Sequence, residues 1–216
     1  MKVVCIIPIK LNNVRLPNKN IKLLNGKPLC SYLFNTIINI DIIDEIYCYC
    51  SDDKIKSYLP EKIKFLLRDN SLDKDTTSMN EVLESFINTI ESDIYVLSHA
   101  TSPFLKEETI NICINNVLNG IYDSAFTGSY IKDFLWYNEK PLNYELNNIP
   151  RTQDLNDVIK ETSGLYVFEK DVFIKSKQRI GFKPYIHLQD TKESIDIDNI
   201  YDFKIAEFIL NENIYN

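Results

Sequence analysis

The feature that most constrains the fold of this chain is the regular alternation of short apolar runs with longer segments of helical periodicity. The runs, such as VVCIIPI at 3–9, are rich in Val, Ile and Tyr, which favour strands. Strands that alternate with helices pair in parallel through right-handed crossovers, so the sequence predicts an α/β fold with a mostly parallel, helix-covered sheet. The expected strands lie at 3–9, 45–51, 62–68, 93–99, 123–129, 161–168, 183–188 and 194–198, and the expected helices at 29–40, 51–59, 78–90, 103–119 and 200–210.

Residues 129–160 interrupt this alternation. The segment is rich in aromatic residues and Asn, holds two prolines and has no clean periodicity. It is either a long surface loop with short hairpins or, because long loops in compact domains are usually functional, a surface for a partner subunit. The aromatic residues that suit such a contact are Phe134, Trp136, Tyr137 and Tyr144.

The overall charge excludes some classes of partner. A net charge of −7 and a pI near 5.0 argue against nucleic acid or an acidic membrane as the main partner. The N-terminal run MKVVCIIPIK is too short for an export signal, and no apolar run approaches the roughly 20 residues of a membrane span. The five cysteines have no CxxC spacing, so we expect reduced thiols, several of them buried, in a cytoplasmic protein.

A donor-rich loop follows the first expected strand. Lys10, Arg15 and Lys19 lie in it, at a carboxyl strand end, where ligands of α/β sheets bind. Fixed cations and amide donors at such a place suit a polyphosphate, although the loop has neither GxxxxGK[ST] nor GxGxxG. A solvated basic turn is the alternative. The amide side chains of this loop are those of Asn12, Asn13, Asn18 and Asn20.

The segment SIDID offers a pair of carboxylates. On a strand, Asp196 and Asp198 point to the same face, and like charges held close are costly unless a cation lies between them. Magnesium, which prefers hard oxygen ligands and shares them with phosphates, fits this pair. The alternative is that Asp198 or Asn199 only caps the terminal helix and that Asp196 is solvated.

Two further strand ends carry polar residues. Thr101 and Ser102 of HATSPF precede a proline-led helix, so Ser102 is either its N-cap or, with the helix N-terminus, a contact for an anionic substrate. Arg68 follows the third strand and pairs either with acidic surface residues or with a nucleotide. The histidines, His99 and His187, are too far apart in sequence to indicate a triad or a zinc site.

Seven segments, in chain order, resemble the motifs of the acylneuraminate cytidylyltransferases, the CMP-sialic acid synthetases, which are similar in fold to the Kdo cytidylyltransferases. The first is PIKLNNVRLPNKNIKLLNGKPL at 8–29, similar to the family's P-A-R-x-G-S-K-x-x-x-K-N-I-x-x-L-x-G-K-P-L. The last is SIDIDNIYDFKIAE at 194–207, similar to S-x-D-I-D-x-x-x-D-x-x-x-A-E. The resemblance runs nearly end to end. The segments between them are IDEIYCYCSDD, RDNSLDKDTTSMNEVL, HATSPF, RTQDL and ETSGLYVF.

This resemblance implies a Rossmann-like nucleotidyltransferase fold and a role for each matched residue. It implies that the first loop wraps the triphosphate of CTP, with catalytic roles for Lys10, Arg15 and Lys19, because phosphoryl transfer concentrates negative charge there. It implies that Asp196 and Asp198 hold Mg²⁺. The other implied contacts are Asn20, Arg68, Thr77 and Ser78 for the nucleotide, and Thr101, Ser102, Arg151 and Gln153 for the sugar.

The resemblance also bears on quaternary structure. In the family, the arm that matches Arg151 and Gln153 reaches the sugar site, sometimes that of the neighbouring subunit. We therefore expect a homodimer in which residues 129–160 form a dimerisation arm on a single domain spanning residues 1–216.

Departures from the family pattern occur in the first loop and near the sugar. Val14 stands where the family has its loop lysine, and Arg15 instead resembles the T-R-L-P of Kdo enzymes. HATSPF lacks the metal-binding Asp of those Kdo enzymes, and His99 and Ala100 replace the Gln and Pro of sialate enzymes. The nucleotide end therefore matches the family better than the sugar end does.

The expected activity is transfer of CMP from CTP to the anomeric hydroxyl of a sialic-acid-like 2-keto acid sugar, with release of pyrophosphate. CTP and an acidic sugar are then the partners, without nucleic acid or membrane. Other acceptors remain open: Kdo, another bacterial nonulosonate such as legionaminic or pseudaminic acid, or a phosphonate. Two non-enzymatic alternatives are a CTP-binding regulatory module and a structural protein that uses the aromatic excursion.

Overall fold

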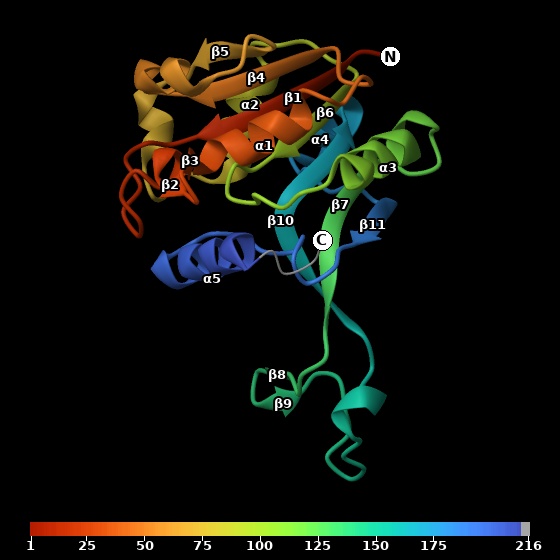
Figure 1. Ribbon diagram of the computed structural model, residues 1–216. Coiled ribbons are helices and arrows are strands. Elements are labelled where there is room, and N and C mark those ends of the chain that lie inside the picture. Colours follow the sequence, from red (N-terminus) through yellow and green to blue (C-terminus); the bar gives the residue numbers. More distant parts are fainter. Residues whose placement is uncertain (213–216) are drawn as a thin grey trace.

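The structure is a computed structural model that describes residues 1–212. Its centre is a seven-stranded sheet of order β11-β7-β10-β6-β1-β4-β5, in which only β10 runs antiparallel to its neighbours (Figure 1). This architecture confirms the predicted α/β class. The strands are β1 Val3–Ile9, β4 Glu45–Cys50, β5 Ile63–Leu67, β6 Ile94–Ser98, β7 Ser124–Ile131, β10 Val158–Glu169 and β11 Pro184–Leu188. The α-helices are α1 Leu29–Ile37, α2 Met79–Ile87, α3 Glu107–Leu118, α4 Lys170–Ser176 and α5 Ile200–Asn211.

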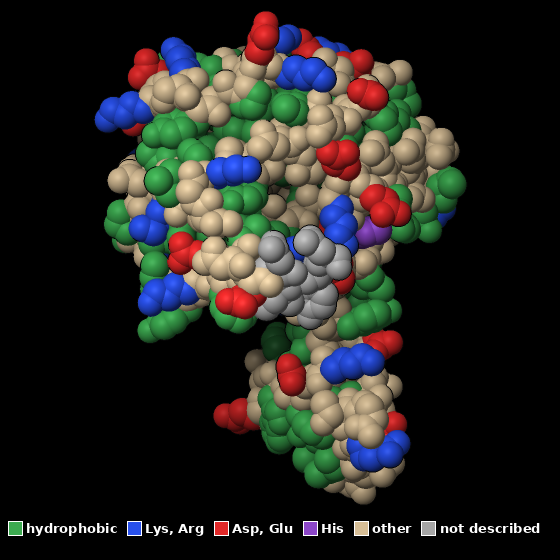
Figure 2. Space-filling view, viewed as in Figure 1, with side chains coloured by type: hydrophobic (Ala, Val, Ile, Leu, Met, Phe, Trp, Pro, Cys, Tyr) green, Lys and Arg blue, Asp and Glu red, His purple; other side chains and the backbone are tan. Residues whose placement is uncertain are grey.

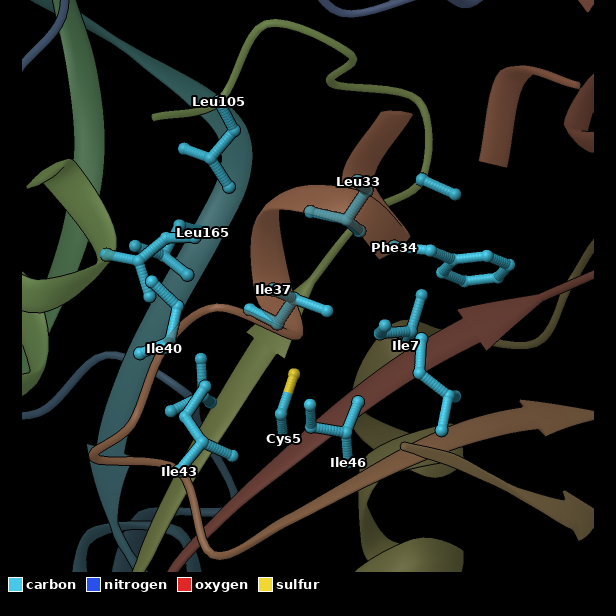
Figure 3. Packing of buried hydrophobic residues seen from close by; sticks show 14 of the residues in the cluster. Cys5, Ile7, Leu33, Phe34, Ile37, Ile40, Ile43, Ile46, Leu105 and Leu165 are labelled. Carbon is cyan, nitrogen blue, oxygen red and sulfur yellow. The ribbon is translucent and has the colours of Figure 1, made fainter. Parts of the chain in front are cut away.

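Strand β1 is buried on both faces, which explains its nearly unbroken apolar sequence. Side chains alternate along it, so Cys5 faces the layer formed by α1 and α3, while Val4 faces the layer that contains α2 and α4. Figure 3 shows the first layer, in which Leu33 and Ile37 of α1 lie over the sheet near Cys5. These two layers hold β1 rigidly, and its carboxyl end therefore has a fixed position.

The excursion at 129–160 projects away from the body of the molecule (Figure 1). The ends of β7 and β10 form its stem, and it carries a hairpin of β8 (Trp136–Tyr137) and β9 (Lys140–Pro141). Tyr144 packs edge-on against Phe134, with ring centroids 5.0 Å apart, yet Trp136 stays 56% exposed. Figure 2 shows apolar side chains gathered on the excursion. The short hairpin matches the sequence prediction, and the role in dimerisation stays a prediction.

Two boundaries predicted from the sequence are wrong. Residues 194–198 are not a strand: Ile197 is buried against Leu16 and Phe203, and its N–H binds the Thr101 carbonyl at 2.8 Å, but no strand among residues 1–212 pairs with this segment. The helix expected from Pro103 begins at Glu107. The buried carboxylate of Glu193 accepts the N–H of Lys106 at 3.0 Å, so a residue 87 positions away caps this helix.

Burial explains the state of the thiols. All five cysteines are buried and free, and Cys48 and Cys50 lie in the same core layer, as their spacing predicts. Burial raises the pKa of Cys30 and Cys113 to about 12, so both stay protonated at neutral pH. Among residues 1–212, no helix combines the length and the apolar character that crossing a membrane requires.

Replacing Phe86 by alanine tests the packing on the α2 face. Phe86 is fully buried, and its ring lies 5.4 Å from that of Tyr49 and 6.3 Å from that of Tyr95. We expect Phe86→Ala to lower the free energy of unfolding by about 3 to 5 kcal/mol in urea titrations, because it leaves a cavity. Phe182→Ala is the control: Phe182 is 89% exposed, and the change should stay within about 0.5 kcal/mol. Equal losses in both variants would contradict this packing.

Candidate active site

A cavity of about 430 Å³ opens at the carboxyl end of β1. Three cations line it, and two carboxylates face them, so the site attracts anions while its own charges stay paired. We call it the cationic cavity. Its lining residues are Lys10, Asn13, Val14, Arg15, Leu16, Lys19, Asp75 and Asp198.

The buried ammonium of Lys19 joins the first loop to the C-terminal segment. Lys19 lies in the 3₁₀ turn η1 (Lys19–Ile21), where its Nζ donates to the Ile197 carbonyl at 2.6 Å and lies 3.4 Å from Asp198 Oδ1. Arg15 Nη1 lies 3.3 Å from Asp198 Oδ2. Asn20 Nδ2 donates to the Lys10 carbonyl at 2.9 Å and closes the loop. The structure therefore brings the predicted catalytic cations together with one of the two predicted metal ligands.

Other side chains cap the last helix, so the Asp198 carboxylate is available to the cations of the first loop. Asn199 is the N-cap of α5, and its side chain accepts the N–H of Tyr201 at 2.7 Å. Asp202 completes the capping box by accepting the N–H groups of Asp198 and Asn199. The capping alternative is thus correct for Asn199 and wrong for Asp198, whose carboxylate faces Arg15 and Lys19.

Asp196 has the character of a cation ligand. Its Oδ1 is buried, and no group among residues 1–212 hydrogen-bonds to it. Burial raises the pKa of Asp196, and the neighbouring Asp198 charge acts in the same direction. A divalent cation would relieve both penalties, so the two aspartates fit Mg²⁺. The described part of the chain has no cluster of three or more ligating side chains, so water or a phosphate would complete the coordination.

Arg68 is buried below the same loop. Its guanidinium donates to Asp73 Oδ1 at 2.7 Å and to the Ile9 carbonyl at 3.0 Å, and it lies 5.8 Å from the centre of the Tyr49 ring. Sequence reasoning placed its acidic partner on the surface, but Asp73 is only 12% exposed. Arg68 thus ties the ends of β1 and β4 to the turn that follows β5.

A second cavity, of about 560 Å³, lies over β4 and β5 and shares the first loop with the cationic cavity. Ser78 follows the lining residue Asp73 closely in sequence and is the N-cap of α2. Its Oγ accepts the N–H of Glu81 at 3.3 Å, and the Glu81 carboxylate accepts the N–H of Ser78, which completes a capping box. Thr77 is half-buried. The residues that line this cavity are Leu11, Asn12, Ser51, Asp52, Asp53, Lys56, Phe65, Leu67, Asn70 and Asp73.

The turn after β6 supports the aspartate segment. The carbonyl of Thr101 holds Ile197, so this turn sets the position of residues 196–198. Ser102 is buried and is not the N-cap of α3, contrary to one sequence alternative, because that helix begins at Glu107. Gly164 of β10 approaches so closely that a Cβ there would lie 2.9 Å from Ser102 Oγ.

Arg151 and Gln153 lie apart from the other predicted site residues. Both are exposed on η4 (Thr152–Asp154) or beside it, within the excursion, and Arg151 pairs locally with Asp154 at 2.6 Å. In Figure 1 the excursion projects from the ends of β7 and β10 away from the body of the molecule. Within one chain the structure therefore does not unite these two residues with the rest of the site.

Sequence reasoning missed two acidic partners of the site. Asp73 binds the buried Arg68, and Asp75 pairs with Lys10 at 2.8 Å. Both lie in RDNSLDKDTTS, a segment in which the sequence assigned roles only to Arg68, Thr77 and Ser78. The signal was the repeated acidic residue after a strand end, but spacing alone does not tell which cation each one meets.

Comparisons with known proteins agree with this geometry. The model of a family described as "Cytidylyltransferase" matches residues 4–209. A pseudaminic acid cytidylyltransferase of Campylobacter jejuni is 25% identical over 99% of this chain and 98% of its own length. An N-acylneuraminate cytidylyltransferase of Streptococcus agalactiae is 23% identical over 94% of this chain, which spans 52% of that relative.

Solved structures show the same fold at low identity. A CMP:2-keto-3-deoxy-manno-octonic acid synthetase complexed with CTP covers 99% of this chain, with a TM-score of 0.74 and 15% identity. A 4-diphosphocytidyl-2C-methyl-D-erythritol synthase from Anaerococcus prevotii covers 97%, with a TM-score of 0.67 and 14% identity. These likenesses confirm the nucleotidyltransferase fold that the motifs implied. The chain therefore belongs to the cytidylyltransferase family and is a nucleotidyltransferase.

Proposed function

We propose that this protein transfers CMP from CTP to the anomeric hydroxyl of an acidic 2-keto acid sugar of the sialic acid class and releases pyrophosphate. The observation that carries the proposal is the convergence of Lys10, Arg15 and Lys19 on the cationic cavity at the carboxyl end of β1. A triphosphate matches this charge and also needs it, because negative charge develops on its oxygens during transfer.

The reaction requires little covalent chemistry from the protein. The acceptor oxygen bonds to the α-phosphorus of CTP, the bond from that phosphorus to the bridging oxygen breaks, and pyrophosphate leaves with the electron pair. The hydroxyl proton passes to solvent. Lys19 is held by the Ile197 carbonyl and Arg15 by Asp198, so both cations are in place before the negative charge develops.

Magnesium is the proposed cofactor, with Asp196 and Asp198 as the residues that would hold it. The buried and unpartnered Oδ1 of Asp196, among residues 1–212, supports this assignment. When bound, the ion supplies positive charge that neutralises phosphate oxygens.

The nucleoside of CTP is proposed to lie on the β4 and β5 side, in the second cavity. Arg68 and Asn20 would support the loop that covers it, because they bind the carbonyls of Ile9 and Lys10. Thr77 and Ser78 would approach the nucleoside from the N-terminus of α2. The Ser78 hydroxyl already serves a capping box, so its backbone is the group we propose to meet CTP.

A homodimer is proposed to complete the sugar end. Thr101 and Ser102 would contribute from the turn after β6, and Arg151 and Gln153 would arrive from the excursion of a second copy. Exposed apolar side chains on the excursion, among them Trp136 and Tyr137, support a role in contact between subunits. We propose a single domain over residues 1–216 and a cytoplasmic location, where CTP is available.

A panel of acceptors tests the function. Pyrophosphate release from CTP should be measured with N-acetylneuraminate, pseudaminic acid, legionaminic acid, Kdo and a phosphonate. We expect turnover with a nonulosonate, because the matched C. jejuni and S. agalactiae relatives are named for such sugars. CTP binding without pyrophosphate release from any acceptor would instead support a regulatory module, and the absence of a CTP-dependent thermal shift would support a structural protein.

Replacing Lys19 by alanine tests the phosphate assignment. We expect kcat to fall about 100- to 1,000-fold, because a preorganised donor at developing charge is commonly worth about 2.7 to 4 kcal/mol. Lys27→Ala, an exposed cation on the nearby strand β3 (Lys27–Pro28), is the matched control and should keep its turnover. Near-normal turnover of Lys19→Ala with CTP would show that the assignment is wrong.

Replacing Asp198 by asparagine tests the metal assignment. The variant loses one carboxylate ligand, so we expect the Mg²⁺ concentration for half-maximal activity to rise at least about 10-fold. Asp171→Asn removes an exposed carboxylate of α4 and should leave the Mg²⁺ titration unchanged. An identical titration for wild type and Asp198→Asn would contradict Mg²⁺ binding at this carboxylate.

A further inference from the structure

The loop between α4 and β11 holds Arg179 in a fixed position. The carboxylate of Asp123 accepts the N–H groups of Phe182 at 2.7 Å and of Lys183 at 3.0 Å. Gly181 packs so tightly that a Cβ there would lie 2.5 Å from the Asp123 carboxylate. One side of the loop is therefore fastened to the start of β7.

Helix α2 fastens the other side of the same loop. Asn80 Nδ2 donates to Gln178 Oε1 at 2.9 Å, and Lys177 Nζ donates to Glu84 at 2.7 Å. Arg179 lies between these attachments and β10, with its guanidinium 4.3 Å from the centre of the Tyr166 ring. A side chain held from three elements has lost its rotamer freedom before any ligand arrives.

The guanidinium of Arg179 is nevertheless poorly satisfied. Its hydrogen bonds to Asn80 Oδ1 and Tyr166 Oη are 3.5 and 3.4 Å long, and its closest approach to Glu161 Oε1 is 3.7 Å. Glu161 instead accepts the Tyr166 hydroxyl. Arg179 Nε is buried and has no partner in the described chain. Charged hydrogen bonds are normally about 2.7 to 2.9 Å long, so this guanidinium keeps unused donor capacity.

A second unpartnered atom lies nearby. His99 follows β6, its N–H binds the Gly164 carbonyl at 3.2 Å, and its Nε2 is buried without a partner within residues 1–212. Burial lowers the pKa of His99 to about 4, and the charges of Arg179 and Lys19 act in the same direction. A neutral imidazole next to a cation offers a hydrogen bond to a hydroxyl without adding charge.

The strand order places β6 and β10 on one side of β1 and the second cavity on the other. β1, with the cationic cavity, lies near the middle of the sheet, and Arg68 and the second cavity lie beyond it at β4 and β5. His99 follows β6 on the opposite side, and Arg179, from the loop before β11, contacts Tyr166 at the irregular stretch of β10. A triphosphate over β1 would therefore have its base on one side and its acceptor beside His99 and Arg179.

We infer that Arg179 binds the carboxylate of the acceptor sugar and that His99 binds a neighbouring hydroxyl. This inference rests on the proposed function and names the residues that select an acidic acceptor. A guanidinium fork matches a carboxylate with two parallel hydrogen bonds, and the unpartnered Nε supplies one of them. Glu161 and Tyr166 are positioning residues, because both lie next to the Arg179 guanidinium.

The experiment compares the nonulosonate that gives the highest turnover in the panel, for example N-acetylneuraminate, with its methyl ester, which lacks the carboxylate charge. Calorimetric titration onto protein saturated with CMP measures the dissociation constant of each compound, and pyrophosphate release gives KM for both substrates. We expect wild type to prefer the acid by about 10- to 100-fold. Arg179→Met should remove this preference and leave KM for CTP unchanged, and Arg179→Lys should restore part of it.

The control and the contrary results are distinct. Lys183→Met removes a cation from the same loop whose Nζ faces the Tyr122 ring, and it should keep the preference for the acid. No preference in wild type, a preserved preference in Arg179→Met, or a higher KM for CTP in that variant would each overturn the inference. The proposed function fails separately, by the absence of pyrophosphate release from wild type with every acceptor of the panel.

Discussion

The buried ammonium of Lys19 is the interaction on which the site depends. It joins the first loop to residues 178 positions away, because its Nζ donates to the Ile197 carbonyl and lies close to Asp198. A desolvated ammonium is costly without acceptors, so the loop and the aspartate segment stabilise each other's positions. The same contact leaves the cations at the end of β1 facing the carboxylates, with a cavity between them.

The sheet then divides the chemistry between its two halves. Arg68 is buried on the β4 and β5 side, where its ion pair with Asp73 stiffens the turn beside the second cavity. His99 and Arg179 lie on the β6 and β10 side, each with a buried and unpartnered nitrogen among the described residues. In the proposed function, the central position of β1 would place the triphosphate between nucleoside and acceptor, as an in-line transfer requires.

Local pattern predicted the fold well and the site only in part. The predictions of β1 and α2 were correct because each element buries the apolar side chains that its sequence pattern places against the core. The strand expected at 194–198 failed because Ile197 packs against Leu16 and Phe203, while Asp198 faces Lys19 instead of a neighbouring strand. Arg179 was missed altogether, because no motif surrounds it and its environment comes from α2, β7 and β10.

The amino-acid sequence by itself determined the α/β class, the buried thiols, the cationic first loop and the family. These features depend on composition, periodicity and motif order, which are local properties of the chain. Only the tertiary structure decided that Asn199 caps α5 while Asp198 faces Lys19, that Arg68 is buried against Asp73, and that Arg151 lies on a projecting excursion. The reason is physical: which charge meets which depends on long-range packing, and sequence spacing carries no information about it.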